Sequence, residues 1–99
     1  MVAFHEKPSP TLHCSGDEDR STQGRRRRAL SRAQQAPADV VVDLSELVFA
    51  DPSFLVDLAM LARRLRLSDR RMLLRGAQPQ IDRLIEMVGL LSQPGVAAA

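Results

Sequence analysis

The stretch VFADPSFLVDLAMLARRLR, residues 48–66, changes its pattern at Ser53. An apolar, strand-like run arrives at Asp51 and Pro52, and a helical pattern leaves from Ser53. In that pattern apolar side chains recur at spacings of three and four residues: Leu55, Leu58, Ala59, Ala62 and Leu65. We therefore expect a helix over 53–67 that covers a core. Ser53 is either the cap of this helix or a hydroxyl placed there for chemistry.

Aliphatic runs precede this helix and a second one. The run VVVDL (40–44) is apolar at consecutive positions, which is typical of a strand buried on both faces of a sheet, and RMLLR (71–75) has the same form. A second amphipathic pattern covers 79–88, with Pro79 in its first turn and Gly89 as its stop. Strand, helix, strand and helix in this order predict parallel strands and an α/β layer.

The first half of the chain carries weaker signals. TLHCSG (11–16) has the form of a strand, and the two prolines of the preceding KPSP predict a turn. Residues 2–5 are then expected to be the other arm of a hairpin. Ser21 or Thr22 is expected to cap a helix over 22–35.

Length and composition limit the class of protein. Ninety-nine residues suit a single domain, 1–99, with a core at about 12–91 and flexible termini, and they leave little room for a deep active-site cavity. The single cysteine, Cys14, has no disulfide partner, and no apolar run approaches the roughly 20 residues that span a bilayer. The N-terminus carries no signal-peptide pattern. These features predict a cytoplasmic binding module without membrane insertion.

The charge pattern argues against direct binding of nucleic acid. The formal net charge is only +2, and much of the positive excess lies in the run RRRR, 25–28. Consecutive residues of a helix point around its axis at about 100° intervals, so these arginines form a collar and not a stripe. One interpretation is a solvated helix surface, and the other is contact with an acidic partner. The chain has no Trp or Tyr to stack on bases.

Several short motifs, in order, resemble those of the STAS domain, the fold of bacterial anti-sigma factor antagonists. SGDEDRST looks like the family's Gly-Glu-Leu-Asp segment, with Asp19 in its acidic position. DVVVDLSELVFADPSFL is similar to the central strand and the loop leading to Asp-Ser-Ser-Gly-Leu. LLRGAQPQIDRLIEMVGL is similar to the last strand, the last helix and the Gly-Leu ending. The resemblance implies a single α/β domain, with a mixed sheet of about four strands and helices mainly on one face.

The resemblance also implies a regulatory binding module and not an enzyme. In the family a partner kinase phosphorylates the second serine of the motif, which here is Ser53. The protein would bind an anti-sigma factor of the serine-kinase type and so free a sigma factor for transcription. The implied partner-binding residues are Asp19, Thr22, Asp51, Ser53, Phe54 and Asp57. The alternative is a STAS adaptor that is not phosphorylated and docks on the subunits of a lipid-trafficking ABC transporter.

Three residues depart from the family pattern. Pro52 replaces the first serine and leaves Ser53 as the only hydroxyl in the motif. Phe54 replaces the usual glycine, and its ring would either obstruct a kinase or contact a different partner. Arg26 stands where the family usually carries an apolar residue facing the sheet, and a buried arginine needs a paired carboxylate. Our hypothesis for Ser53 is a double role, as a helix cap when free and as a switch that releases the partner when phosphorylated.

No combination of side chains in the sequence predicts catalysis, a metal or a cofactor. His5, His13 and Cys14 lack the paired spacing of metal ligands. Cys14 is expected to be a small buried residue, and Asp43 is expected to form hydrogen bonds in a loop. The methionines expected in the core are Met60, Met72 and Met87.

Overall fold

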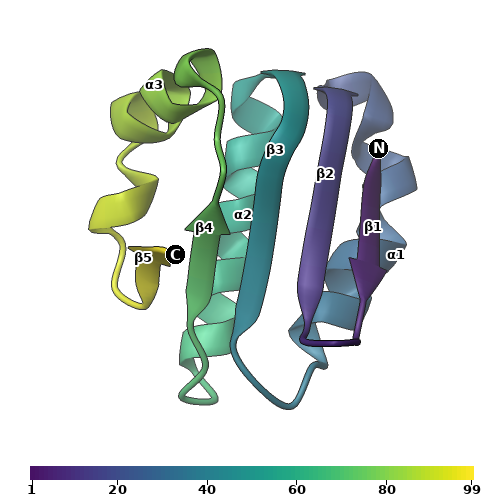
Figure 1. Cartoon of the computed structure of the whole chain (residues 1–99), viewed down its shortest axis with the longest axis vertical. Coiled ribbons are helices and arrows are strands. Elements are labelled where there is room, and N and C mark those ends of the chain that lie inside the picture. Colours follow the sequence, from purple (N-terminus) through teal and green to yellow (C-terminus); the bar gives the residue numbers. More distant parts are fainter.

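The computed structural model describes residues 1–99. Its five strands form one sheet with the order β1-β2-β3-β4-β5 (Figure 1). The strands are β1 (Val2–His5), β2 (Thr11–Glu18), β3 (Val40–Ala50), β4 (Met72–Arg75) and β5 (Val96–Ala98). Strands β1 and β2 pair antiparallel as a hairpin, and the other three pairings are parallel. The predicted mixed sheet is confirmed, with one strand more than the sequence indicated.

Three helices connect or follow the strands, and their ends agree with the expected ranges to within one residue. They are α1 (Gln23–Gln34), α2 (Pro52–Arg66) and α3 (Pro79–Val88), and 3-10 turns cover Arg20–Thr22 and Leu90–Ser92. Figure 1 shows α1 and α2 side by side behind the sheet, so the helices cover mainly one face, as expected. None of these helices combines the length and the apolar character needed to cross a membrane.

The expected parallel pairing of β3 with β4 is confirmed, with Val40 opposite Met72. The expectation that β3 is buried on both faces is wrong. Val40 and Val42 are fully buried, whereas Val41 between them is only half-buried. The reason is that the helices cover one face of the sheet, so that alternate residues of each strand point away from them.

The core reaches both ends of the chain. Val2 and Phe4 from β1 and Val96 from β5 belong to the buried cluster, so the terminal segments, expected to be flexible, form the edge strands of the sheet. Two methionines expected in the core lie at the surface, since Met60 is 48% and Met87 is 77% exposed. The fold is nevertheless the single α/β domain that the sequence predicts.

The length of β2 and β3 brings the segments before α1 and α2 to the same end of the sheet. These strands remain paired to their carboxyl ends, where Glu18 lies opposite Ala50. The backbone N–H of Asp51 then donates to the carbonyl oxygen of Glu18 at 3.1 Å. The segment that leads into α1 and the segment that leads into α2 therefore leave the sheet side by side, because parallel strands end at the same edge.

Candidate functional site at the start of helix α2

Asp51 caps helix α2. Its Oδ1 atom accepts hydrogen bonds from the backbone N–H of Ser53 at 2.9 Å and from the Ser53 hydroxyl at 2.5 Å. Pro52 occupies the first helical position, where a backbone N–H would have no partner within the helix. The expectation that Ser53 is the cap is wrong, because the aspartate two residues earlier supplies the accepting oxygen and Ser53 is already inside the helix.

A second aspartate organises the neighbouring turn. Asp19 Oδ1 accepts from the backbone N–H groups of Ser21 at 2.8 Å and Thr22 at 3.2 Å, and the Thr22 hydroxyl oxygen accepts from the N–H of Asp19 at 3.0 Å. Thr22, one of the two residues expected to cap α1, does occupy the N-cap position, but its side chain makes no capping hydrogen bond to the helix. Asp51 Oδ2 accepts from the N–H of Arg20 at 3.1 Å, which joins this turn to the start of α2.

Arg26 lies beneath both segments and is only 1% exposed. Its Nε atom donates to Asp57 Oδ2 at 2.8 Å, and its Nη1 atom donates to Glu18 Oε1 at 3.2 Å. The Glu18 side chain is itself 2% exposed. An unpaired charge at this depth would be strongly destabilising, so the two carboxylates are what allow the arginine to be buried here. The expectation that Arg26 needs a carboxylate partner is confirmed.

Arg26 also donates hydrogen bonds to the turn before α1 and to the start of α2. Nη1 also donates to the Asp19 carbonyl oxygen at 2.9 Å and to the Thr22 hydroxyl oxygen at 3.1 Å. Nη2 donates to the Ser53 hydroxyl oxygen at 3.3 Å, and the guanidinium carbon lies 5.4 Å from the centre of the Phe54 ring. The Ser53 hydroxyl therefore lies between a cation and a carboxylate. The sequence predicted that Arg26 would face the sheet and need a carboxylate partner, but it did not place Arg26 in this site.

The local charge of the site is negative. Hydrogen bonding by the Ser53 side chain is the main cause that lowers the pKa of Asp51, and hydrogen bonding by the Ser21 side chain does the same for the pKa of Asp19. Both carboxylates are therefore ionised at neutral pH. Four carboxylates meet two cations here. The carboxylates are those of Glu18, Asp19, Asp51 and Asp57, and the cations are Arg26 and the N-terminal ammonium of Met1, which lies 2.7 Å from Glu18 Oε2.

The structure gathers the six partner-binding residues named above at this end of the sheet, but it does not expose all of them. Phe54 is 1% exposed and belongs to the core, so its ring neither covers Ser53 from outside nor offers a surface to a partner, in contrast to the expectation. The exposed apolar side chains nearby are Val48, Phe49 and Val56, each more than half exposed. Sequence reasoning missed Val48 and Phe49 because the apolar run before Asp51 has the form of a buried strand.

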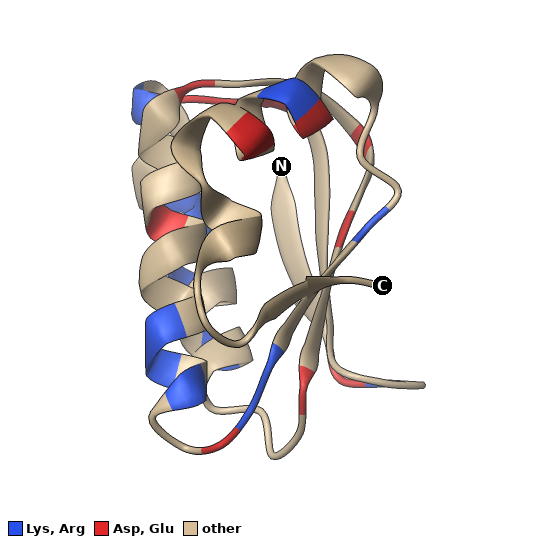
Figure 2. Cartoon of the chain, turned by 90° about the vertical axis from the view of Figure 1, so that its left-hand side faces the viewer, with Lys and Arg blue, Asp and Glu red and all other residues tan.

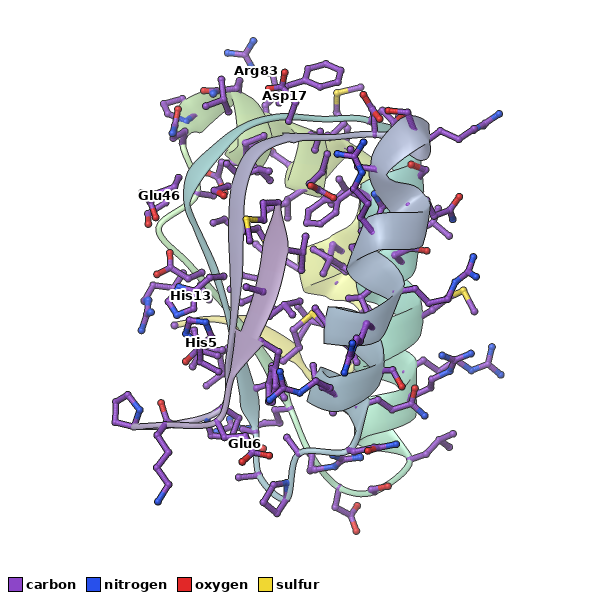
Figure 3. All side chains as sticks on the ribbon, turned by 90° about the vertical axis from the view of Figure 1, so that its right-hand side faces the viewer. His5, Glu6, His13, Asp17, Glu46 and Arg83 are labelled. Atoms are coloured by element: carbon purple, nitrogen blue, oxygen red, sulfur yellow. The ribbon has the colours of Figure 1, made fainter.

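The other titratable residues singled out in the sequence lie elsewhere. Figure 3 shows His5 and His13 on the face of the sheet away from α1 and α2, with ring centroids 4.9 Å apart. Burial of Cys14 raises the pKa of its thiol to about 12. Asp43 accepts from the N–H of Ser45 at 3.0 Å, so the expected hydrogen bonding is present, although in strand β3 and not in a loop. No group of three or more His, Cys, Asp or Glu side chains is arranged to hold a metal ion.

Comparison with known proteins agrees with this architecture. The family described as "Mlab, STAS domain" matches residues 2–92. The solved structure titled "Structure of the Anti-Sigma Factor Antagonist SpoIIAA in its Unphosphorylated Form" aligns with a TM-score of 0.70 at 18% sequence identity. The alignment covers 100% of this chain and 87% of that chain. No curated protein matches the sequence. The structural likeness shows a shared fold, and because the family match covers most of the sequence, this chain belongs to the STAS domain family.

Proposed function

We propose that this protein is an anti-sigma factor antagonist, a non-enzymatic module that binds an anti-sigma factor of the serine-kinase type and is switched by phosphorylation of Ser53. The observation that carries the proposal is the position of the Ser53 hydroxyl. It is the only side-chain hydroxyl in the first turn of α2, it is half-buried, and it contacts both Asp51 and Arg26. A modification of this one oxygen therefore acts on two charged groups at once.

Phosphorylation would replace the hydroxyl proton that Ser53 donates to Asp51. A dianion would then stand beside the Asp51 carboxylate, and the two groups would repel each other. The helix N-terminus and Arg26 offset part of this repulsion, so the helix itself need not unfold. Asp51 also accepts from the N–H of Arg20, so movement of its carboxylate would loosen the turn at 20–22.

The same change would alter the surface offered to a partner. The site already holds more carboxylates than cations, and a phosphate would make it more negative. A partner surface that packs closely over the start of α2 would then have to cover the charge of the phosphate without a cation to pair with it, which releases the partner without a change of fold. The proposed contact residues are Asp19, Thr22, Asp51, Ser53 and Asp57, with the exposed Val56 in place of the buried Phe54.

The test is incubation with the candidate kinase and ATP, followed by intact-mass measurement. We expect addition of one phosphoryl group to the wild type and to Ser21→Ala, which removes a hydroxyl from the neighbouring turn. Ser53→Ala should remain unmodified. An unmodified wild type, or equal phosphorylation of Ser53→Ala, would overturn the assignment of Ser53 as the acceptor.

A second candidate function is a STAS adaptor that docks on the subunits of a lipid-trafficking ABC transporter without being phosphorylated. The contacts that carry the first proposal can also be weighed against it. They leave the Ser53 hydroxyl half-buried and hydrogen-bonded on both sides, so a kinase would have to break them to reach this oxygen, whereas an unmodified adaptor would not require this. Affinity capture from the native host separates the two functions. Recovery of permease and ATPase subunits, in equal amounts with wild type and Ser53→Asp, would favour the adaptor, whereas recovery of a kinase that Ser53→Asp fails to capture would favour the antagonist.

A further inference from the structure

The small net charge of the chain conceals a strong separation of charge. Helices α1 and α2 carry eight of the fourteen basic residues and one of the twelve acidic residues. The formal charge of these two helices is therefore +7, and the other segments together carry −5. Figure 2 shows Lys and Arg gathered on the helical layer, while most of the Asp and Glu lie on the sheet, α3 and the connecting loops.

Most of these arginines have no carboxylate partner. Of the eight, only Arg26 forms an ion pair, and the other seven are exposed: Arg25, Arg27, Arg28, Arg32, Arg63, Arg64 and Arg66. Arg64 donates to the side-chain oxygen of Gln34 at 3.2 Å, and Arg32 donates to the carbonyl oxygen of Phe4 at 3.5 Å. Like charges that are close together repel each other, so this face has an electrostatic cost that an anionic partner would remove.

A groove of about 380 Å³ runs between the two helices in the middle of this face. Its apolar part is formed by Leu30 of α1 and by Met60 and Leu61 of α2. Met60 is 48% exposed, whereas Leu61 is only 3% exposed and belongs to the core. Arg27 lines the groove from α1, and Arg64 lines it from α2. Asp57 of α2 also lines the groove, but its carboxylate is paired with Arg26. The groove thus combines a partly apolar lining with an unpaired cation on each helix.

A second hollow of about 390 Å³ lies on the other side of Met60. Val56 and Met60 supply apolar surface there, and Arg63 and Arg66 supply positive charge. Val56 is 56% exposed. The outer face of α2 therefore repeats the same combination, in which exposed apolar side chains are flanked by unpaired arginines.

We propose that the face formed by α1 and α2 is a docking surface for an acidic, amphipathic helical segment of a partner protein. An apolar side chain of that segment would lie in the groove on Met60, and its carboxylates would pair with Arg27 and Arg64. Charge complementarity supports the acidic character of the partner. The concave shape of this partly apolar groove favours a protein segment over a flat lipid surface. The absence of an exposed aromatic residue on these helices disfavours nucleic acid.

This surface adjoins the proposed partner contact at the start of α2. Val56, a proposed contact residue there, also lines the second hollow, and Asp57 also lines the groove. That site is negative and contains Ser53, whereas the face of α1 and α2 is positive and centres on Met60. Helix α2 is 15 residues long, which is about 22 Å, so a partner helix of similar length could lie along the groove.

The test is fluorescence anisotropy with a labelled synthetic helix of about 15 residues that carries leucines at i, i+4 spacing and glutamates elsewhere. The matched probe replaces each glutamate by glutamine. We expect the wild type to bind the glutamate peptide more tightly than the glutamine peptide, with an affinity that falls as salt rises. The double variant Arg27→Gln with Arg64→Gln should weaken binding by about tenfold or more.

The matched control is Arg75→Gln with Arg83→Gln, which removes the same charge outside this face and should leave the affinity nearly unchanged. Ser53→Asp should also leave it unchanged, so this proposal and the proposed function can fail independently. Equal binding of both peptides, or an equal loss in the control variant, would overturn the proposal. Tighter binding to vesicles of anionic phospholipid or to duplex DNA than to the glutamate peptide would also overturn it and assign the face to that other partner. Thermal melts check that each variant is folded.

Discussion

Arg26 is buried between the carboxylates of Glu18 and Asp57, and its donors also reach Thr22 and Ser53. Glu18 and Thr22 precede Arg26 by eight and four residues, whereas Ser53 and Asp57 of α2 follow it by 27 and 31 residues. Every buried polar side-chain atom in the structure has a hydrogen-bond partner, so the network is complete. A complete buried network fixes the relative position of its members, and loss of one member exposes the others to a desolvation cost.

The variant Arg26→Leu tests this network. It places an apolar residue at this position and leaves the 2% exposed Glu18 with the N-terminal ammonium of Met1 as its remaining charged partner, so we expect the free energy of unfolding to fall by about 3 kcal/mol. Adding Glu18→Gln should recover part of that loss, because the buried charge is removed. The control is Arg27→Leu, an exposed neighbour, which should change stability by less than about 0.5 kcal/mol. Urea denaturation measures all three. An Arg26→Leu protein as stable as the wild type would show that the network contributes little.

The two residues at the start of α2 have different structural roles. Asp51 caps the helix and accepts from Arg20, so Asp51→Ala should cost about 1–2 kcal/mol. Ser53→Ala loses hydrogen bonds of its hydroxyl but keeps the cap, and we expect a smaller loss. Chemical denaturation of both variants under identical conditions gives the comparison. A larger loss for Ser53→Ala than for Asp51→Ala would contradict the assignment of Asp51 as the cap.

Asp43 provides a pH-dependent contribution to stability. The hydrogen bond from the N–H of Ser45 is the main cause that lowers the pKa of Asp43 to about 2. Because the pKa in the folded state is below that in the unfolded state, the stabilisation is complete above about pH 4 and is lost as the pH falls toward about 2. Asp43→Asn should therefore melt at a lower temperature than the wild type at neutral pH. The difference should shrink as the pH falls through this range, and a difference independent of pH would contradict the prediction.

The elements differ in how much of them the sequence reveals. The ends of α2 and α3 could be predicted because an apolar stripe, an N-terminal proline or a C-terminal glycine marks each of them locally. Strand β5 could not, because its three residues, Val96–Ala98, have no periodic pattern and are ordered by pairing with β4. The cap of α2 was misassigned because Asp51 and Ser53 are both good capping residues, and only the backbone geometry separates them.

Two glycines in different elements should respond in opposite ways to alanine. Gly76, immediately after β4, has a φ of +74°, and an added Cβ would lie 3.1 Å from the Cβ of Ser45. Gly76→Ala should therefore destabilise the protein by at least about 1 kcal/mol. Gly24 lies within helix α1 with open space around it, so Gly24→Ala should stabilise by about 0.5–1 kcal/mol. Thermal denaturation reports both, and the same sign for both variants would contradict this account.

At the scale of the whole molecule, two surfaces of opposite charge lie next to each other on one fold and meet at Val56 and Asp57 of α2. The sequence and its resemblance to the family located the negative surface, since motif order alone identified Asp19, Asp51 and Ser53. They did not show that Phe54 is buried or that Arg26 connects the segments, because both facts depend on how α1 and α2 pack on the sheet. The positive surface was visible only as an arginine run, since its other half comes from α2 and meets α1 in the folded chain.

The central claim is that the partner binds at the start of α2. Hydrogen–deuterium exchange of the protein, free and in complex with the candidate anti-sigma factor, tests it directly. We predict that the partner slows exchange of the backbone amides at 51–57 and at 19–22, and that Ser53→Asp reduces this protection while the amides of β3 remain protected by the sheet. Protection confined to other parts of the surface, with no change at 51–57, would contradict the claim.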